Sequence, residues 1–431
     1  MAPKRFAAEK ADPSPLAQPL KFDISGKTAK NRFMKAAMTE RLSSWDPKVL
    51  EKRGVPSKEL VNVYRRWGEG GYGVILTGNV MIEYDQLEAA GNAIVPRDAP
   101  FSGERFDAFK DLATAAKKHG SLMVAQVSHP GRQVTDRIQK NPISASDVRL
   151  EKEMMGMQFA KPRPMEKKDF ENVIEGFAHA AEYLHKAGFD GVELHAAHVR
   201  SGYLLSQFLS PTTNKRTDQY GGSVLNRSRI IIEIIKAIRE RVADKSFIVG
   251  IKVNSVEFQS GGFTPEDCKT LCAELEKNEF DFVELSGGTY QEFVMKHQRE
   301  STRKREAFFL EFADIVIPEL KKTKAYVTGG FRTTKGMKLL DSKVDSAIET
   351  LFDEENFGMM AVVAGTQIRA VGQGREPLDF SREDHKKIFE ASMQKWGQTM
   401  AADKEGSRYG YVDIEGLKLE PFGVPYAAAS L

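Results

Sequence analysis

Cysteine is scarce in this chain of 431 residues, which has only two. Cys268 and Cys272 lie four residues apart within a helical pattern. One helical turn is a poor place for a disulfide, and two thiolates are too few for an iron–sulfur cluster. We therefore expect two reduced cysteines that pack in the core, in a protein from a reducing compartment.

Long hydrophobic runs are also missing. No apolar run approaches the ~20 residues that a membrane helix needs, and the N-terminal MAPKRFAAEKADPSP has no apolar signal core. The final residues ASL resemble a peroxisomal S-K-L ending only weakly. The cytoplasm is therefore the expected location.

Neither sign of charge is in excess, since 63 basic and 60 acidic residues give a formal net charge of +3. This balance gives no case for a nucleic-acid partner or a membrane surface. The basic run KHQRESTRKRE, from Lys296 to Glu306, contains two acids and is interpreted as a solvated loop. A hydrophobic content of 41% and a charged content of 29% are normal for a soluble enzyme. We expect a monomer or homodimer with a small-molecule substrate.

Apolar runs of strand length alternate with helical patterns along the chain. Most of the runs are continuously apolar, as expected of parallel strands that are covered on both faces. One helical pattern, TPEDCKTLCAELEKN, begins with Thr264 as N-cap and Pro265 at the first helical position. Eight repeats predict an α/β fold of the (β/α)8 TIM-barrel type, followed by a C-terminal extension over 376–431 that packs on it. The eight expected strands span 31–38, 72–77, 121–127, 189–195, 247–253, 280–286, 325–330 and 358–365.

The segment GEGGYG (68–73) matches the pattern G-x-G-x-x-G. That pattern binds a dinucleotide only when it follows a strand and opens a helix. Here it follows a helical pattern and precedes an apolar run, so we interpret it as a turn.

Two histidines and a tyrosine follow the fourth apolar run, in GVELHAAHVRSGYLLSQFLSP. His195 and His198 are three residues apart, and Tyr203 follows five residues later. Active sites of (β/α)8 barrels lie at the C-terminal ends of the strands, which favours catalysis over simple packing. Two neutral imidazoles can donate hydrogen bonds to one carbonyl oxygen and stabilise the charge that develops on it. With His129, they could instead form a zinc site of a hydrolase, but Asp and His are sparse at the other strand ends, and we expect no metal.

Several blocks, in order along the chain, resemble the Old Yellow Enzyme family, the FMN-dependent NAD(P)H:flavin oxidoreductases and ene-reductases. The resemblance spans most of residues 18–375 and implies one FMN-binding (β/α)8 barrel. It also implies bound FMN and either NADPH or NADH as reductant. The blocks are KNRFMKAAMTE, VAQVSHPGRQ, PRPMEKKDFENVIEGFAHAAEYLHKAG, FDGVELHAAHVRSGYLLSQFLSPTTNKRTDQYGGSVLNRSR and VTGGFRT.

The resemblance also implies contacts to the flavin ring. Thr39 matches the position that hydrogen-bonds the flavin O4 edge, and Gln126 can pair with the pyrimidine edge as donor and acceptor. Lys252 stands where most members carry arginine, and a cation there stabilises negative charge on reduced flavin. The remaining implied contacts are Ala36, Ala37, which is usually proline in the family, Met38, and Gly78 or Asn79.

The phosphate of FMN is expected at the last two strands. Gly329 and Gly330 fit a close backbone approach to phosphate. At the end of the eighth run the family carries a Gly-Arg pair, whereas here Gly365 is followed by Thr366. Two arginines could supply the missing charge, Arg369 and Arg332.

The implied reaction reduces activated alkenes through flavin N5 with ping-pong kinetics, since one pocket serves both substrates. The two histidines would bind the electron-withdrawing oxygen, and Tyr203 would protonate Cα. The family spelling is H-x-x-[HN]-G-Y, but here Val199, Arg200 and Ser201 intervene and displace the tyrosine unless they bulge out. The alternative is a flavin-poor, catalytically impaired relative that acts as a binding protein.

Overall fold

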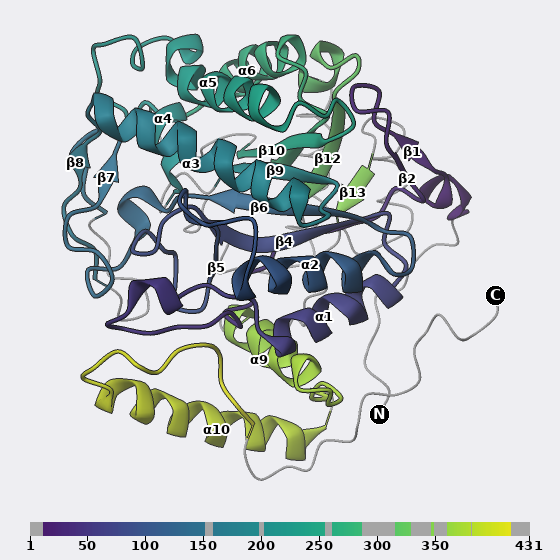
Figure 1. The fold of residues 1–431 in the computed structure, drawn as a ribbon, viewed down its shortest axis with the longest axis vertical. Coiled ribbons are helices and arrows are strands. Elements are labelled where there is room, and N and C mark those ends of the chain that lie inside the picture. The colour runs from purple at the N-terminus through teal and green to yellow at the C-terminus, as the bar shows by residue number, and fades with distance from the viewer. Residues whose placement is uncertain are drawn as a thin grey trace.

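A parallel sheet surrounded by helices forms the centre of the protein in the computed structural model (Figure 1). The structure describes residues 12–150, 158–197, 202–254, 261–286, 315–328, 346–348, 360–380 and 382–414. Neighbouring strands of this sheet are parallel, which requires a crossover connection between each pair. Helices supply these crossovers in the part of the chain that the structure describes, as the alternating sequence pattern predicts.

The strands follow one another around the sheet in chain order. The last strand, β13, also lies next to the first, β3, so the two edges meet as in a (β/α)8 barrel. A short strand, β5 (Ala93–Ile94), pairs with the end of β4. The eight barrel strands are β3 (Met34–Lys35), β4 (Val74–Met81), β6 (Leu122–Ser128), β9 (Gly191–Ala196), β10 (Ile248–Asn254), β11 (Phe282–Ser286), β12 (Lys324–Thr328) and β13 (Ser346–Ile348).

The helices cover the outside of the sheet. The start of α6 has the predicted cap, because the Thr264 hydroxyl accepts from the Asp267 N–H at 3.1 Å and Pro265 follows it. Cys268 and Cys272 are buried in the same helix and form no disulfide, as expected. The helices are α1 (Lys58–Glu69), α2 (Glu104–Lys117), α3 (Lys167–Lys186), α4 (Leu204–Leu209), α5 (Val224–Val242), α6 (Pro265–Lys277), α9 (Met360–Gly372) and α10 (Glu383–Ala402).

A two-stranded hairpin closes the N-terminal end of the barrel. Its antiparallel strands are β1 (Leu20–Lys21) and β2 (Thr28–Ala29). Phe22, at the end of β1, places its ring 6.0 Å from that of Phe282 and 6.4 Å from that of Tyr326 inside the barrel. The hairpin lies at one end of the molecule, and the short strands β7 (Ile143–Ser144) and β8 (Arg163–Pro164) lie at the other (Figure 1).

Seven of the eight expected strands are confirmed, and the eighth is wrong. Residues 360–365 of the run 358–365 belong to α9, which continues to Gly372. A short apolar run does not distinguish a buried strand from a buried helix, and here the apolar character continues for helical length through TQIRAVG. The last barrel position is taken by β13, which pairs with β12.

The glycine-rich segment 68–73 forms a turn between α1 and β4, as expected. Gly70 caps the end of α1, and Gly71 adopts a φ of 81° that suits glycine. The chain then enters β4 at Val74, so no helix begins here to receive a pyrophosphate.

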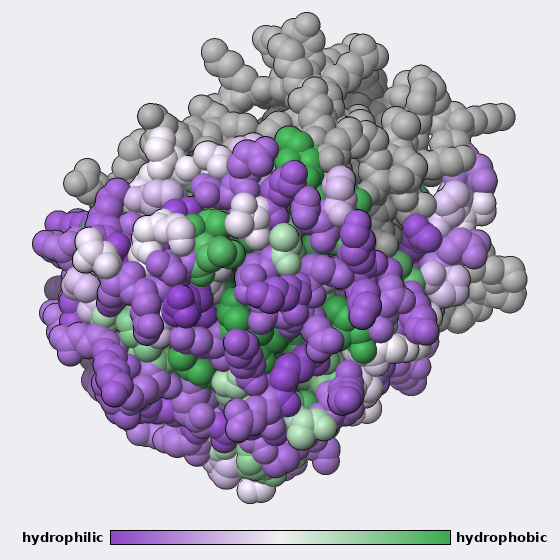
Figure 2. Space-filling view, turned by 90° about the horizontal axis from the view of Figure 1, so that it is seen from above, coloured by the Kyte–Doolittle hydropathy of each residue, from purple (hydrophilic) through white to green (hydrophobic). Residues whose placement is uncertain are grey.

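The C-terminal elements lie against α1, with α9 next to α1 and α10 outside α9 (Figure 1). A small separate core forms between them from Ala370, Leu378, Phe389, Val412 and Ile414. The division of the chain at residue 376 stays a prediction. None of the helices in the described part has the length and apolar character that a membrane crossing requires. The face seen over α5 and α6 is mainly hydrophilic, with small hydrophobic areas (Figure 2).

Candidate active site

The interior of the barrel changes from apolar to polar toward the C-terminal ends of the strands. Alternate residues of a strand point to the same face, so each strand contributes every second residue to the interior. Near the N-terminal end these are apolar: Val74, Val124, Ile248, Phe282 and Tyr326. Further along the strands they are polar: Gln126, Glu193, Lys252, Glu284 and Thr328.

The polar residues form one connected layer, which we call the charged layer. Lys252 Nζ lies 2.6 Å from Glu284 Oε1, and the Thr328 hydroxyl donates to the same oxygen at 2.5 Å. The Gln126 amide donates to Glu193 Oε1 at 2.7 Å. Sequence reasoning found Gln126 and Lys252, but it missed the two glutamates, which lie inside runs interpreted as continuously apolar.

The charged layer holds one ion pair and one neutral acid. Burial raises the pKa of Glu193 well above its usual range, and the nearby charge of Glu284 adds to the effect. Burial opposes ionisation of Glu284 as well, but Lys252 and the hydrogen bonds from Glu193 and Thr328 outweigh it and lower its pKa. The pKa of Lys252 is raised despite burial, because the negative charge of Glu284 lies beside it. Lys252 and Glu284 are therefore charged. Glu193 stays protonated and donates a hydrogen bond to the Glu284 carboxylate.

A second network of side-chain hydrogen bonds connects the ends of three strands at the mouth of the barrel. The Asn79 amide donates to the Tyr203 hydroxyl at 2.8 Å and to the Thr39 hydroxyl at 3.1 Å. The Ser128 hydroxyl donates to the Asn79 carbonyl oxygen at 2.7 Å, which fixes the orientation of the amide. The structure thus brings together three residues that the sequence assigned to the site from separate blocks.

His195 and Tyr203 lie ring against ring, with centroids 3.8 Å apart and an interplanar angle of 30°. Both side chains are buried. His195 Nδ1 accepts from the Ala197 N–H at 3.4 Å, which leaves the proton of the neutral ring on Nε2. Tyr203 immediately precedes α4, and the Leu204 N–H donates to the His129 carbonyl at 2.9 Å. Tyr203 is therefore held in the site beside His195. His198 and the inserted residues 199–201 lie outside the described residues.

His129 and Glu83 form a pair that the sequence did not reveal. His129 is buried, and its Nδ1 accepts from the Gly131 N–H at 3.0 Å. Its Nε2 lies 3.9 Å from Glu83 Oε1. Burial lowers the pKa of His129 to about 3, and burial followed by the charge of Asp85 raises the pKa of Glu83 to about 7. His129 is therefore neutral near pH 7, whereas Glu83 is about half protonated there. Within the described ranges, no three His, Cys, Asp or Glu side chains gather as a metal site.

Gly78 allows the loop after β3 to approach β4. A Cβ at Gly78 would lie 2.2 Å from Glu40 Oε2 and 2.3 Å from the Met38 carbonyl. The Gly78 N–H donates to Glu40 Oε1 at 2.9 Å, and the Tyr64 hydroxyl donates to the same oxygen. The register of β4 against β6 shifts between Leu76 and Asn79, so this irregularity directs Asn79 into the site. The neighbouring Ala36, Ala37, Met38 and Thr39 run from the end of β3 into this loop.

Lys35 is a further buried cation beside this loop that sequence reasoning missed. Its Nζ donates to the Leu76 carbonyl at 2.9 Å and lies 3.8 Å from the centre of the Trp67 ring. Burial lowers the pKa of Lys35 to about 8. Its contacts face the α1 side of β4, so it supports the loop from outside the barrel.

Only some of the residues expected to contact the FMN phosphate lie in the described part of the chain. Gly329, Gly330 and Arg332 lie outside the described residues. Gly365 and Thr366 lie in α9 instead of at a strand end, and a Cβ at Gly365 would lie 2.1 Å from Tyr411 Cγ. The Arg369 guanidinium donates to the Tyr411 carbonyl at 2.9 Å. The roles of Gly365 and Thr366 at a phosphate stay predictions, and the face of Gly365 is occupied by an aromatic ring.

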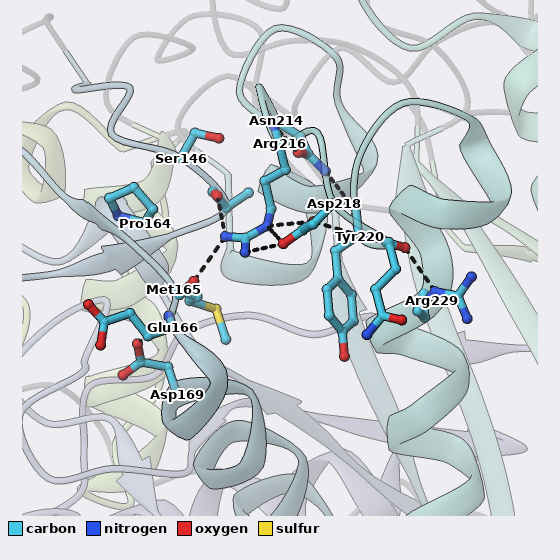
Figure 3. Close-up of polar contacts among 12 residues, drawn as sticks. Ser146, Pro164, Met165, Glu166, Asp169, Asn214, Arg216, Asp218, Tyr220 and Arg229 are labelled. Carbon is cyan, nitrogen blue, oxygen red and sulfur yellow. Dashed lines mark hydrogen bonds and ion pairs between the residues drawn. The ribbon is translucent and has the colours of Figure 1, made fainter.

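The rim beyond α4 is fixed by Arg216 (Figure 3). Its guanidinium donates to the Met165 carbonyl at 2.9 Å and the Ala145 carbonyl at 3.1 Å, and it pairs with the Asp218 carboxylate at 3.0 Å. These contacts join the segment after α4 to the β7–β8 pair. The helix that follows Tyr203 is thereby held from its far end.

Comparisons with known proteins agree with this geometry. Residues 15–346 match the family described as NADH:flavin oxidoreductase / NADH oxidase. The chain is 46% identical over 424 residues to NADH-dependent flavin oxidoreductase nadA of Aspergillus parasiticus, covering 92% of this chain and 95% of that protein. It is 32% identical over 335 residues to NADH-dependent flavin oxidoreductase iliE of Hypocrea jecorina, covering 73% and 79%. The old yellow enzyme from Trypanosoma cruzi has the same fold, with a TM-score of 0.64 at 19% identity over 79% of this chain and 89% of that chain.

Proposed function

The chain belongs to the NADH:flavin oxidoreductase / NADH oxidase family, and we propose that it reduces activated C=C bonds of α,β-unsaturated carbonyls and nitroalkenes. Family membership makes it an oxidoreductase that uses FMN and NAD(P)H. Bound FMN supplies hydride transfer, which no amino-acid side chain provides. The names of the two fungal relatives make NADH the first reductant to test.

Residues of the charged layer and of the mouth together fit an isoalloxazine ring. Such a ring needs amide-like partners for its pyrimidine edge and a cation near N1 and O2. Gln126 offers both a donor and an acceptor, and Lys252 is a buried cation with a raised pKa. Thr39 and Asn79 add a hydroxyl and an amide that already contact each other. We assign these four side chains, with the backbone of Ala36, Ala37 and Met38, to the ring.

The contact of His195 with Tyr203 carries the proposal. The Nε2–H of His195 is a donor for the electron-withdrawing oxygen of the alkene, where negative charge develops. Tyr203 supplies the proton to Cα, and His198 completes the pair of imidazoles. The Asn79 N–H donates to the phenol oxygen and favours the charge that Tyr203 carries after it gives up its proton. Arg41 contributes in the same sense, since its charge interacts with Tyr203.

Location, oligomeric state and kinetics belong to the same proposal. We propose a cytoplasmic protein that acts as a monomer or homodimer on a small-molecule substrate. One pocket serves the reductant and the alkene in turn, so the kinetics should be ping-pong.

A visible absorption spectrum of the purified protein, before and after incubation with FMN, tests the proposal first. We expect a bound-flavin spectrum that bleaches when NADH or NADPH is added without oxygen. Addition of 2-cyclohexenone or a nitroalkene should then restore the oxidised spectrum, and the saturated product should appear in equal amount. A protein that stays colourless after reconstitution would support the alternative of a flavin-poor binding protein.

A further inference from the structure

The segment after α10 returns to the mouth of the barrel. We call residues 403–414 the C-terminal strap, which runs back along α10 as the yellow loop in Figure 1. The Trp45 indole donates to the Gly406 carbonyl at 2.7 Å, and the Tyr411 hydroxyl donates to the Thr39 carbonyl at 3.1 Å. The strap therefore holds the loop after β3 at two separate points.

Tyr411 is wedged between α9 and that loop. On one side, its ring fills the space left by the missing side chain of Gly365, where a Cβ would lie 2.1 Å from Tyr411 Cγ. On the other side, the Arg41 guanidinium lies 4.9 Å from the centre of the ring. Arg369 holds the Tyr411 carbonyl at 2.9 Å and pairs with Asp413 at 3.3 Å. The backbone on both sides of the ring is thus anchored to α9.

The contact continues from Thr39 into the candidate active site. The Thr39 carbonyl accepts from Tyr411, and its hydroxyl accepts from Asn79. Asn79 in turn donates to Tyr203 at 2.8 Å. Hydrogen bonds therefore connect four residues, from the strap, the β3 loop, β4 and the start of α4.

We propose that Tyr411 is a positioning residue, which holds Thr39 and through it Asn79 in the geometry that the reaction needs. The inference rests on the proposed function, in which Thr39 lies at the flavin edge and Tyr203 supplies a proton. Because the Tyr411 hydroxyl contacts Thr39 directly, removal of that hydroxyl should loosen the β3 loop around Thr39 while the ring still fills its pocket. The C-terminal extension then has a role in the reaction in addition to packing.

The variant Tyr411→Phe tests this, with Tyr409→Phe in the same strap as the matched control. The Tyr409 hydroxyl makes no hydrogen bond within the described residues, whereas its ring packs near Gly91. With FMN bound, we expect Tyr411→Phe to shift the flavin absorption band and midpoint potential. It should also lower kcat about fivefold, the size of one lost hydrogen bond, with little change in KM. Tyr409→Phe should behave as the wild type.

A second variant adds a methyl group on the other side of the Tyr411 ring, at Gly365. Gly365→Ala should displace the Tyr411 ring and give the same change in the flavin spectrum. Combined with Tyr411→Phe it should be non-additive, because both act on one contact. Additive effects would mean that the two residues act independently, which contradicts the inference.

Hydrogen exchange separates failure of this inference from failure of the proposed function. Amides of residues 36–45 should exchange faster in Tyr411→Phe than in the wild type and Tyr409→Phe, whether or not FMN is bound. If exchange and the flavin spectrum are unchanged, or if only the thermal midpoint falls, Tyr411 has no positioning role. If the wild type reduces no alkene while Tyr411→Phe still shows both changes, the proposed function fails and the positioning role stands.

Discussion

Lys252 and Glu284 form an ion pair of 2.6 Å inside the barrel, on strands β10 and β11 that place the two residues directly opposite each other. Neither charge is accessible to water, so each depends on the other for compensation. Glu193 approaches from β9 on the other side and stays protonated. The layer below the expected flavin ring therefore has one positive charge, held in place by one negative charge.

The two glutamates should respond very differently to replacement by glutamine. Glu284→Gln leaves Lys252 buried without a counter-charge, and we expect a loss of about 3–5 kcal/mol in the free energy of unfolding. Glu193→Gln replaces a neutral acid by a neutral amide that can still donate to Glu284 and accept from Gln126, so we expect a loss below about 1 kcal/mol. Urea denaturation of both variants measures the difference. Equal losses would show that Glu193 is ionised in the folded protein.

Removal of the Tyr203 hydroxyl should affect only the oxidative half of the reaction. Tyr203→Phe keeps the ring against His195 but removes the proton donor, and we expect alkene reduction to slow by about 10²-fold or more. The bleaching of the flavin by NADH should be unchanged, since it needs no proton from this residue. Stopped-flow absorbance resolves the two halves.

A suitable control for that variant is Tyr220→Phe, whose hydroxyl donates to Glu233 at 2.9 Å on the rim. It should leave both half-reactions at wild-type rates. An unchanged rate of alkene reduction in Tyr203→Phe would remove this residue from the mechanism and leave water as the proton donor.

Glu83 should make the protein less stable as the pH rises. Its folded pKa of about 7 lies above the usual value of 4.5, because burial disfavours the charged form, with Asp85 and Asp169 adding to the shift and Arg97 opposing it. Between pH 4.5 and about pH 7 the folded state binds more protons at Glu83 than the unfolded state does. The free energy of unfolding therefore falls as the pH rises through this range. Glu83→Gln should therefore stabilise the protein at pH 8 and have little effect below pH 4.5.

The size of that effect has an upper limit. At 1.36 kcal/mol per pKa unit, the raised pKa corresponds to at most about 3 kcal/mol, and solvent screening reduces this because 32% of the side chain is exposed. Thermal unfolding from pH 5 to pH 8 tests it, with Glu390→Gln on the exposed face of α10 as the control. A gain that is independent of pH would show that Glu83 does not titrate in this range.

The sequence predicts seven of the barrel strands correctly, because each is a short apolar run between turn residues. It fails at 358–365, because GMMAVVAG is equally compatible with a helix that buries one side, as α9 does. The residues proposed for the flavin edge were also accessible to sequence reasoning, since Thr39 and Gln126 stand in blocks that resemble a known family, and Lys252 lies on an expected strand where most members carry arginine. A family resemblance assigns a role to a residue only where the surrounding sequence can be matched to the family.

The rest of the site could not be predicted because it depends on contacts between distant segments. Glu284 and Glu193 are hidden in apolar runs, and only the alternation of side chains shows that they face inward. Glu83 meets His129 through the fold alone. Gly365 was expected to approach a phosphate, yet its missing side chain makes room for Tyr411, 46 residues away.

Gly78 gives the last prediction, which tests how the β3 loop reaches the site. In Gly78→Ala the new methyl group would meet Glu40 at 2.2 Å and the Met38 carbonyl at 2.3 Å, so the loop must move away from β4. We expect a loss of stability of about 2–4 kcal/mol and weaker retention of FMN during gel filtration. Gly397→Ala in α10 is the matched control, because nothing lies within 4 Å of its added Cβ. That variant should gain up to about 1 kcal/mol from better helix propensity and keep its FMN. If Gly78→Ala retained both its stability and its FMN, the close approach of the β3 loop to β4 would not be needed for the site.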